Sequence, residues 1–379
     1  MIYFDNAATT LPKPEAVKEA VCRALDTLGN SDRGVHDASL GSMRVIYQAR
    51  ELTARIFGAS SPSRVAFAKN ATEALNVAIR GLIKPGDHVI TTDAEHNSVL
   101  RPLYALEKEG ITLSFLPCDE TGRVRLEALE SLVRPNTRAV VCTHASNVTG
   151  NVVDAAQIGN FCRKRGLLFI LDVSQTAGVL DINMEALGAD VICFTGHKGL
   201  YGPQGTGGLC VREGVEIAPL LRGGSGVQSY LREQPPQMPT RLEAGTQNAH
   251  GLAGLEAGIR FVLETGLNRI RERERMLTLR FYRGIRDVPG IKIYGDVTAE
   301  NHTAVVAFNI GDYDSGQVAD ELAVRFGIAS RPGAHCAPRM HEALGTKEQG
   351  AVRFSFSWFN TEEEIDQGVE AVRLLAWED

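Results

Sequence analysis

The sequence has no excess of positive charge, no long apolar run and no leader pattern. Its 379 residues carry 40 Lys and Arg against 46 Asp and Glu, a formal net charge of −6. Such a chain offers no basic field to nucleic acid or to an anionic membrane. Residues 1–10 lack a basic start followed by an apolar core, and no apolar run approaches the ~20 residues of a membrane span. We therefore expect a cytoplasmic protein with no nucleic-acid or membrane partner.

The cysteines also lack a pattern. They form no CxxC pair and no regular framework, so neither a disulfide scaffold nor a structural metal site is expected. The seven are Cys22, Cys118, Cys142, Cys162, Cys193, Cys210 and Cys336. Internal repeats and low-complexity tracts are absent too, and the short proline-rich piece 234–239 is interpreted as a loop.

What the sequence does contain, over residues 65–211, is an alternation of β-branched runs with helical stretches. This pattern is typical of a mostly parallel sheet covered on both faces by helices, which is an α/β fold. Helices are predicted at 72–82 and 155–165. Strands are predicted at 65–68, 88–92, 113–116, 139–143, 167–171, 191–194 and 208–211.

The pattern changes after a helix that begins near residue 251. Apolar residues then recur at helical spacing from Leu267 to Ile285 in a charged segment, which predicts a long amphipathic helix leading into a second lobe. Strands near 291–294 and 303–310 and a helix near 315–326 indicate a small α+β domain, which the N-terminal strand is expected to join. We predict a large domain at 12–258 and a small one made of 1–11 and 259–379.

Polar residues follow several predicted strands, and ligands of open α/β sheets bind beyond the carboxyl ends of strands. The segment from Lys69 to Glu73 opens a helix, so its free N–H groups and the Thr72 hydroxyl suit an anion such as phosphate. A simple helix cap is the alternative for Thr72. His96 follows the next strand, where it could stack on an aromatic ring, move protons or be merely structural.

Two later strand ends carry a carboxylate and a lysine. Asp172 follows the apolar run 167–171, where a carboxylate is costly to bury without a cationic partner such as a pyridinium nitrogen. Lys198 follows the strand at 191–194 in a segment rich in Gly, Thr and His. A partly desolvated lysine has a lowered pKa and reacts readily with an aldehyde. Together, Asp172 and Lys198 favour a site for an aldehyde cofactor with a pyridine ring. The alternative, that Lys198 is a solvated loop lysine, is disfavoured.

A set of short motifs is spread over nearly the full length of the chain. They are Asp5 to Thr9, Arg33 to His36, Ala71 to Glu73, Glu95-His96, Ser146-Asn147, Asp172 to Gln175, Thr195 to Lys198, Glu243 to Thr246 and Arg331 to Ala337. In these motifs the chain resembles the fold-type I, class V aminotransferase family, and within it the cysteine desulfurases and selenocysteine lyases. The resemblance implies a large mostly parallel-sheet domain, a small α+β domain and the cofactor pyridoxal 5′-phosphate. It also implies L-cysteine or selenocysteine as substrate, a thiol or protein sulfur acceptor, and a homodimer.

The resemblance assigns roles around the cofactor ring. Lys198 resembles the lysine that binds the cofactor covalently and then serves as acid and base. Asp172 resembles the partner of the pyridine nitrogen, and His96 the catalytic residue that stacks on the ring. Gln175 resembles the group bonded to the phenolic oxygen, and Asn147 a residue that contacts the ring or the substrate.

The resemblance also places the cofactor phosphate. Thr72, Thr195 and His197 look like phosphate ligands, with Ala71 beside them at the start of the helix. Thr246 resembles a residue that reaches the phosphate across a dimer interface, which implies a homodimer with composite active sites.

The substrate side of the site falls mainly on the C-terminal part. Arg353 resembles the arginine that binds the substrate carboxylate, a task suited to a bidentate guanidinium, and Arg331 is expected to support it. His36 and Asn147 are further candidates for substrate contact. Cys336 resembles the thiol that receives sulfur as a persulfide.

The Cys336 segment resembles the short loop of the second desulfurase group. Ala334 stands where a histidine is common in that group, and Pro332 where a small polar residue is common. Because Cys336 lies near Arg331 and His335 in the sequence, we expect its thiolate to be favoured. The surrounding Gly and Pro indicate an exposed turn instead of an inert core cysteine.

Several other functions remain open from the sequence. A selenocysteine lyase, a cysteine sulfinate desulfinase or another aminotransferase would share the fold and cofactor. A non-catalytic sulfur carrier or scaffold is a different class, although a scaffold has no use for a complete cofactor site. A metal enzyme using His335, Cys336 and His341 is a weaker alternative, because their spacing matches no zinc motif.

Overall fold

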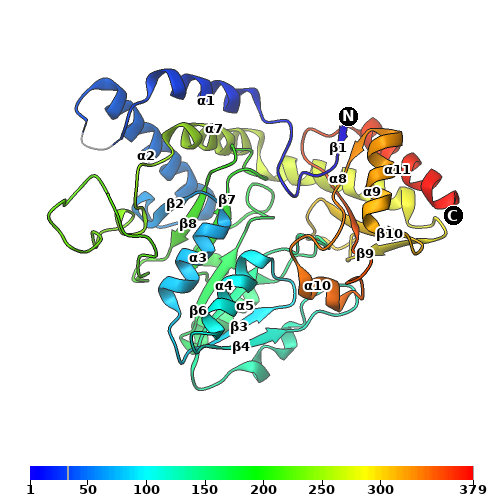
Figure 1. The fold of residues 1–379 in the computed structure, drawn as a ribbon, viewed down its shortest axis with the longest axis horizontal. Helices are drawn as coiled ribbons and strands as arrows, with labels where there is room; N and C mark the ends of the chain where they lie inside the picture. Colours follow the sequence, from blue (N-terminus) through cyan, green and yellow to red (C-terminus); the bar gives the residue numbers. More distant parts are fainter. Residues whose placement is uncertain (32–33, 379) are drawn as a thin grey trace.

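The computed structural model describes residues 1–31 and 34–378. Its central feature is a seven-stranded sheet of order β2-β8-β7-β6-β5-β3-β4 (Figure 1). The strands are β2 (Val65–Ala68), β3 (His88–Thr92), β4 (Thr112–Leu116), β5 (Thr137–Thr143), β6 (Leu168–Asp172), β7 (Val191–Thr195) and β8 (Gly207–Val211). All seven were predicted to within two residues at each end.

Helices cover both faces of this sheet because its side chains alternate between two cores. Along β5, Val140 and Cys142 pack into one core, and Ala139 and Val141 pack into the other. The first core is completed by α2 (Asp37–Phe57), α5 (Ala155–Arg165), α6 (Met184–Leu187) and α7 (Ala249–Thr265). The second core is completed by α3 (Ala71–Leu82) and α4 (Asn97–Glu107). Helix α1 (Glu15–Thr27) packs on α7.

The sheet is parallel from β4 to β7, whereas β8 runs antiparallel to both β7 and β2. The strand pattern alone did not predict this reversal. A parallel crossover needs a dozen or more residues, usually with a helix. The connection 196–206 is shorter and contains no helix, so β8 must run back beside β7.

A second group of elements is built from the C-terminal third of the chain and the N-terminus. Its antiparallel sheet has the order β12-β10-β9, and β1 (Ile2–Tyr3) pairs in parallel with β11 (Ile328–Ala329), as expected for the N-terminal strand. The remaining elements are α8 (Leu267–Ile285), β9 (Ile291–Tyr294), β10 (Val305–Ile310), α9 (Ser315–Phe326), α10 (Pro338–Ala343), β12 (Val352–Ser355) and α11 (Glu362–Trp377). Short 3₁₀ helices span Pro62–Arg64, Leu126–Ala128, Glu130–Leu132 and Thr240–Leu242.

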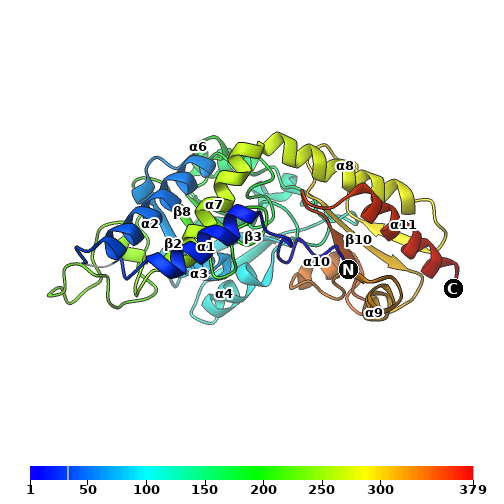
Figure 2. The same ribbon diagram turned by 90° about the horizontal axis from the view of Figure 1, so that it is seen from above.

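A long helical connection joins the two groups of elements (Figure 2). Helix α7 ends at Thr265 and α8 begins at Leu267, with Gly266 at a φ of 93° between them. Only glycine adopts such a φ without strain, so the helix direction changes there. The amphipathic pattern is confirmed, since Ile270, Leu277 and Phe281 are buried. The predicted domain boundary at 258 falls inside α7, and the division into two domains stays a proposal.

The N-terminal segment lies between the large sheet and the C-terminal elements. Phe4 packs with Phe354 and Phe356 in the core of the C-terminal group, and Ala7 and Ala8 reach the edge of the large sheet. No helix within the described residues is long and apolar enough to cross a membrane.

Candidate active site

A cavity of about 330 Å³ lies at the carboxyl edge of the large sheet, which we call the sheet-edge cavity. Residues after β2, β3, β5, β6 and β7 form one side of it, and the N-terminal segment and the C-terminal part form the other. Of the predicted site residues it is lined by Ala71, Thr72, His96, Asn147, Asp172, Gln175, Thr195, His197, Lys198, Arg331, Cys336 and Arg353. Parallel strands place their ends at one edge, which is why these distant residues meet.

Two predicted residues do not line this cavity in the single chain. Thr246 is exposed beside a different cavity, which it shares with Lys69 and Glu73. His36 is exposed at the start of α2, where its ring accepts a hydrogen bond from the Ser39 N–H. Arg33, part of the same motif as His36, lies outside the described residues. A site contribution from Thr246 or His36 therefore requires a second subunit.

Lys198 lies in a segment held by the N-terminal part of the chain. The Thr10 hydroxyl donates to the Lys198 carbonyl at 3.1 Å, and the Lys13 ammonium donates to the His197 carbonyl at 2.7 Å. Burial lowers the pKa of Lys198 from 10.5 to about 8, although the charge of Asp172 opposes that shift. Burial disfavours the charged ammonium, so a larger share of this amine is neutral and nucleophilic near pH 8.

Asp172 ends β6 and is 4% exposed. Its carboxylate accepts hydrogen bonds from the Ser174 N–H at 2.9 Å and the Ser174 hydroxyl at 2.5 Å. Within the described residues it makes no ion pair at 4 Å or less. A buried carboxylate lining a cavity without a paired cation fits a ligand that supplies one.

His96 caps the start of α4 and is held in one tautomer. The Ser98 N–H donates to its Nδ1 at 3.0 Å, so Nδ1 is the acceptor and the neutral ring carries its proton on Nε2. Burial, followed by the charge of Lys198, lowers the pKa of His96 to about 4. The Ser98 hydroxyl also contacts that of Thr72 at 2.8 Å. Ser98 thus positions two site residues, a role that sequence reasoning missed.

Several buried polar atoms beside the cavity have no hydrogen-bond partner among the described residues. They are Asn147 Oδ1, Thr195 Oγ1, His197 Nδ1 and Arg353 Nε. Buried polar groups are nearly always satisfied, so such a cluster indicates a ligand or ordered water. Because Thr195 and His197 were expected to bind a phosphate, their free atoms fit the predicted cofactor.

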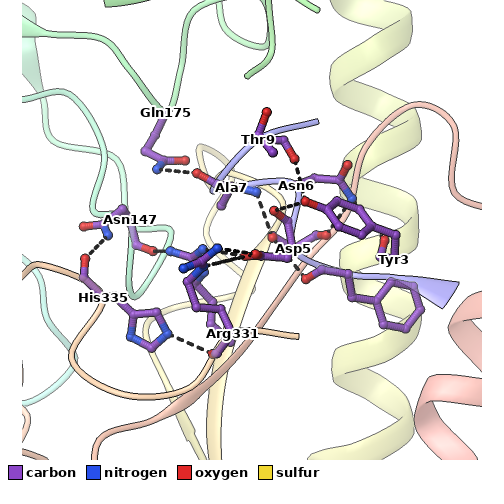
Figure 3. Close-up of polar contacts among 12 residues, drawn as sticks. Tyr3, Asp5, Asn6, Ala7, Thr9, Asn147, Gln175, Arg331 and His335 are labelled. Carbon is purple, nitrogen blue, oxygen red and sulfur yellow. Dashed lines mark hydrogen bonds and ion pairs between the residues drawn. The ribbon is translucent and has the colours of Figure 1, made fainter. Parts of the chain in front are cut away.

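Asp5 organises the substrate side of the cavity (Figure 3). The Arg331 Nε–H is shared between both of its carboxylate oxygens at 3.0 Å, and Arg331 Nη2 donates to Oδ2 at 2.7 Å. The Asp5 carboxylate also accepts a hydrogen bond from Arg353 Nη2 at 3.0 Å, and Arg353 Nη1 donates to the Asn147 carbonyl at 2.9 Å. Burial lowers the pKa of Arg353 to about 10, opposed by Asp5, so this guanidinium keeps its charge at neutral pH. The sequence motif included Asp5 without revealing this role.

Cys336 is exposed at the rim of the cavity, as its turn-like neighbourhood predicted. The expectation that His335 favours the thiolate is wrong, because burial lowers the pKa of His335 to about 3 and leaves the ring neutral. Of the two expected neighbours, Arg331 is the one that keeps a positive charge. Its pKa is raised, chiefly by its hydrogen bonds to Asp5 and to a smaller extent by the charge of Cys336.

The metal alternative receives no support from the described residues. They contain no group of three His, Cys, Asp or Glu side chains arranged to hold a metal ion. His335 Nδ1 and His341 Nε2 face each other at 3.3 Å and are hydrogen-bonded to one another. Of the other cysteines, Cys142, Cys162, Cys193 and Cys210 are buried, Cys118 is half-buried after β4, and Cys22 is exposed on α1.

Comparison with known families agrees with this arrangement. Residues 2–367 match the model of the aminotransferase class-V family. The chain belongs to this family. A probable cysteine desulfurase of Methanothermobacter thermautotrophicus is 35% identical, with 99% of this chain and 94% of that protein aligned. Another, from Pyrococcus abyssi, is 34% identical over 97% of this chain and 92% of its own length.

A solved structure confirms the fold. The apo structure of the cysteine desulfurase from Thermococcus onnurineus NA1 superposes with a TM-score of 0.93 at 33% identity. The match covers 100% of this chain and 95% of that one. The class V, fold-type I prediction is therefore confirmed.

Proposed function

We propose that the protein is a pyridoxal-phosphate-dependent cysteine desulfurase that converts L-cysteine to L-alanine and leaves the sulfur on Cys336 as a persulfide. One observation carries the assignment of residues. Lys198, a buried amine with a lowered pKa, and Cys336, an exposed thiol, line the same cavity beside two arginines. An amine that binds an aldehyde and a thiol that attacks sulfur are the two reactive groups that this reaction needs.

The residues present fit the cofactor. Lys198 would bind its aldehyde carbon, Asp172 would pair with its ring nitrogen, and His96 would stack on its ring. Its phosphate would take the free N–H groups at the start of α3 and the unpartnered atoms of Thr195 and His197. When bound, the cofactor serves as the electron sink for carbanion chemistry at the substrate Cα.

The protein's own groups then carry the proton and sulfur transfers. Lys198 Nζ, released by the incoming substrate amine, removes the proton from the substrate Cα. The Cys336 thiolate attacks the substrate sulfur, so a sulfur–sulfur bond forms while the bond from Cβ to sulfur breaks. The electron pair of the broken bond stays with the three-carbon fragment, which takes up protons and leaves as L-alanine. Arg331 stabilises the attacking thiolate.

The two arginines would bind the substrate carboxylate. Arg353 is 2% exposed, and Asp5 and the Asn147 carbonyl fix its guanidinium from two sides. Arg331 is half-exposed and shares Asp5, so both cations face the cavity from fixed positions. Pre-oriented cations lose little entropy when they bind an anion.

The exposure of Cys336 suits a second transfer. A persulfide at the cavity rim is open to attack by an acceptor thiol, from a small molecule or from a protein, and that attack regenerates Cys336.

A homodimer would complete the site with Thr246 and His36 from the partner subunit. The long segment between β8 and α7 projects from the body of the chain, at the left of Figure 1. It exposes the apolar side chains of Leu221, Val227, Tyr230 and Leu231. Exposed apolar side chains gathered in one segment are typical of an interaction surface, and this segment leads directly to Thr246.

The activity is tested by incubating the purified protein with L-cysteine, pyridoxal phosphate and a reductant. We expect equal amounts of L-alanine and sulfide, because every sulfur removed leaves one alanine. Release of alanine from selenocysteine or cysteine sulfinate, with none from L-cysteine, would keep the fold and cofactor but overturn the substrate. Consumption of a keto acid without sulfide release would indicate an aminotransferase.

The lowered pKa of Lys198 predicts how the apoprotein captures its cofactor. Only the neutral amine reacts with an aldehyde, so the rate should rise with pH and level off above about pH 8 instead of rising toward 10.5. The measurement is visible absorbance after mixing apoprotein with pyridoxal phosphate. In Asp172→Asn the midpoint should move to lower pH, because the negative charge that raises the pKa of Lys198 is gone. A wild-type rate still rising steeply at pH 10 would contradict this.

A further inference from the structure

The backbone of the Cys336 turn is strained. His335 and Cys336 have φ values of 49° and 56°, so two consecutive residues with side chains occupy the left-handed region. This region is unfavourable for residues other than glycine, and such strain persists only where the surroundings hold it. Two carbonyl contacts are part of that support. The Asn97 N–H donates to the Cys336 carbonyl at 2.7 Å, and the Asn147 side chain donates to the His335 carbonyl at 2.7 Å.

The third support is the His335 ring, which takes part in a chain of hydrogen bonds with a fixed direction. His335 Nε2 lies 3.0 Å from the Arg331 carbonyl, which can only accept, so Nε2 carries the proton (Figure 3). In a neutral ring His335 Nδ1 must then accept, so His341 Nε2 donates to it across 3.3 Å. His341 Nδ1 must accept in turn, and the Thr346 hydroxyl donates to it at 2.8 Å.

Burial makes this direction stable. His341 and Thr346 are 1% and 2% exposed. The imidazole rings of His335 and His341 lie nearly parallel, at an interplanar angle of 13°. Burial lowers the pKa of both histidines, which keeps both rings neutral. Protonation of His335 would place its Nδ1–H face to face with the Nε2–H of His341. The chain from Thr346 to the Arg331 carbonyl therefore has one arrangement of protons at neutral pH.

We propose that His341 is a positioning residue for the nucleophile, which it holds through His335 although it does not line the sheet-edge cavity. His341 fixes the tautomer and orientation of the His335 ring, and that ring closes the turn from Arg331 that directs the Cys336 thiol to the cavity rim. The inference rests on the proposed function for the identity of the reaction. The hydrogen-bond chain itself is independent of it.

The test compares two substrates that differ in their need for Cys336. L-cysteine requires attack by the thiol, whereas the sulfinate group of cysteine sulfinate leaves without it. His341→Leu removes both hydrogen bonds, and His341→Gln keeps an amide N–H that can donate to His335. We expect His341→Leu to lower the ratio of alanine release from L-cysteine to that from cysteine sulfinate by about 10- to 100-fold, the cost of misplacing a reacting group by ~1 Å. His341→Gln should recover most of it.

A merely structural role would give a different result, because general destabilisation lowers both rates and leaves their ratio unchanged. An unchanged ratio in His341→Leu overturns the proposal. If that variant does not fold, Thr346→Val takes its place, because it removes only the hydroxyl donor. It should lower the ratio of the two rates by a smaller factor, and an unchanged ratio in Thr346→Val would also overturn the proposal.

A second readout does not depend on turnover. In the Cys22→Ala background, Cys336 is the exposed thiol among the described residues, so iodoacetamide reports on it in the holoenzyme. Alkylation should slow in His341→Leu, because the thiol moves away from the Arg331 guanidinium. If wild type releases no sulfide from L-cysteine, the proposed function fails. The alkylation rates still decide the role of His341, and equal rates in both proteins would then overturn it.

Discussion

Replacing Lys198 with alanine is expected to abolish alanine release from L-cysteine and from cysteine sulfinate alike. In the proposed mechanism the variant loses the amine that would bind the cofactor aldehyde and also the group that would move the Cα proton. The second loss alone is worth on the order of 10²- to 10⁴-fold in rate. The rate of alanine release should fall for both substrates, because both reactions need an electron sink at Cα.

The measurement pairs activity with the visible absorbance of the dialysed protein. Lys198→Ala should lose the band that remains in wild type, since pyridoxal phosphate would be held only by non-covalent contacts. Lys108→Ala is the matched control, because Lys108 is exposed at the end of α4, away from the cavity. A Lys198→Ala protein that keeps both the band and the activity would refute the assignment of this lysine.

Replacing Cys336 with alanine is expected to separate the two substrates. Turnover of L-cysteine should fall by at least about 10³-fold, because removing a covalent nucleophile removes the reaction path and not just one contact. Cysteine sulfinate should keep most of its alanine release, since Lys198, Asp172 and the arginines remain in place. Cys22→Ala controls for the loss of an exposed thiol that does not line the sheet-edge cavity.

Mass spectrometry of the trapped enzyme gives an independent check. After one turnover without reductant, wild type should gain one sulfur atom on the peptide that contains Cys336, and the variant should gain none. Full sulfide release by Cys336→Ala would mean that another group accepts the sulfur. Loss of activity on both substrates would show that the residue supports the site as a whole.

Much of the fold could be predicted because the sequence records local periodicity. The boundaries of α5, α9 and β9 agree with the prediction at both ends, since each begins and ends at a clear change of pattern. The antiparallel β8 was not predicted, because strand direction depends on the length and path of the connection and not on the strand's own residues.

The site divides in the same way. The place of Asp172 and Lys198 in the cavity could be predicted because each stands at or just after the end of a strand, where an open α/β sheet binds its ligands. The role of Asp5 was not found, because it pairs with Arg331 from 326 residues away. The neutral state of His335 was missed for a related reason. Sequence neighbours indicate nearby charge, whereas the pKa of a buried imidazole is set mainly by the loss of water around it.

By itself, then, the sequence determined the α/β class, the family resemblance and the lysine, carboxylate and cysteine on which the proposed chemistry depends. These follow from residue type and local spacing, which a linear chain carries directly. Only the tertiary structure decided that Asp5 holds both arginines, that Ser98 orients His96, and that His341 faces His335. Such contacts form between segments brought together by packing, and burial then fixes which atoms carry protons.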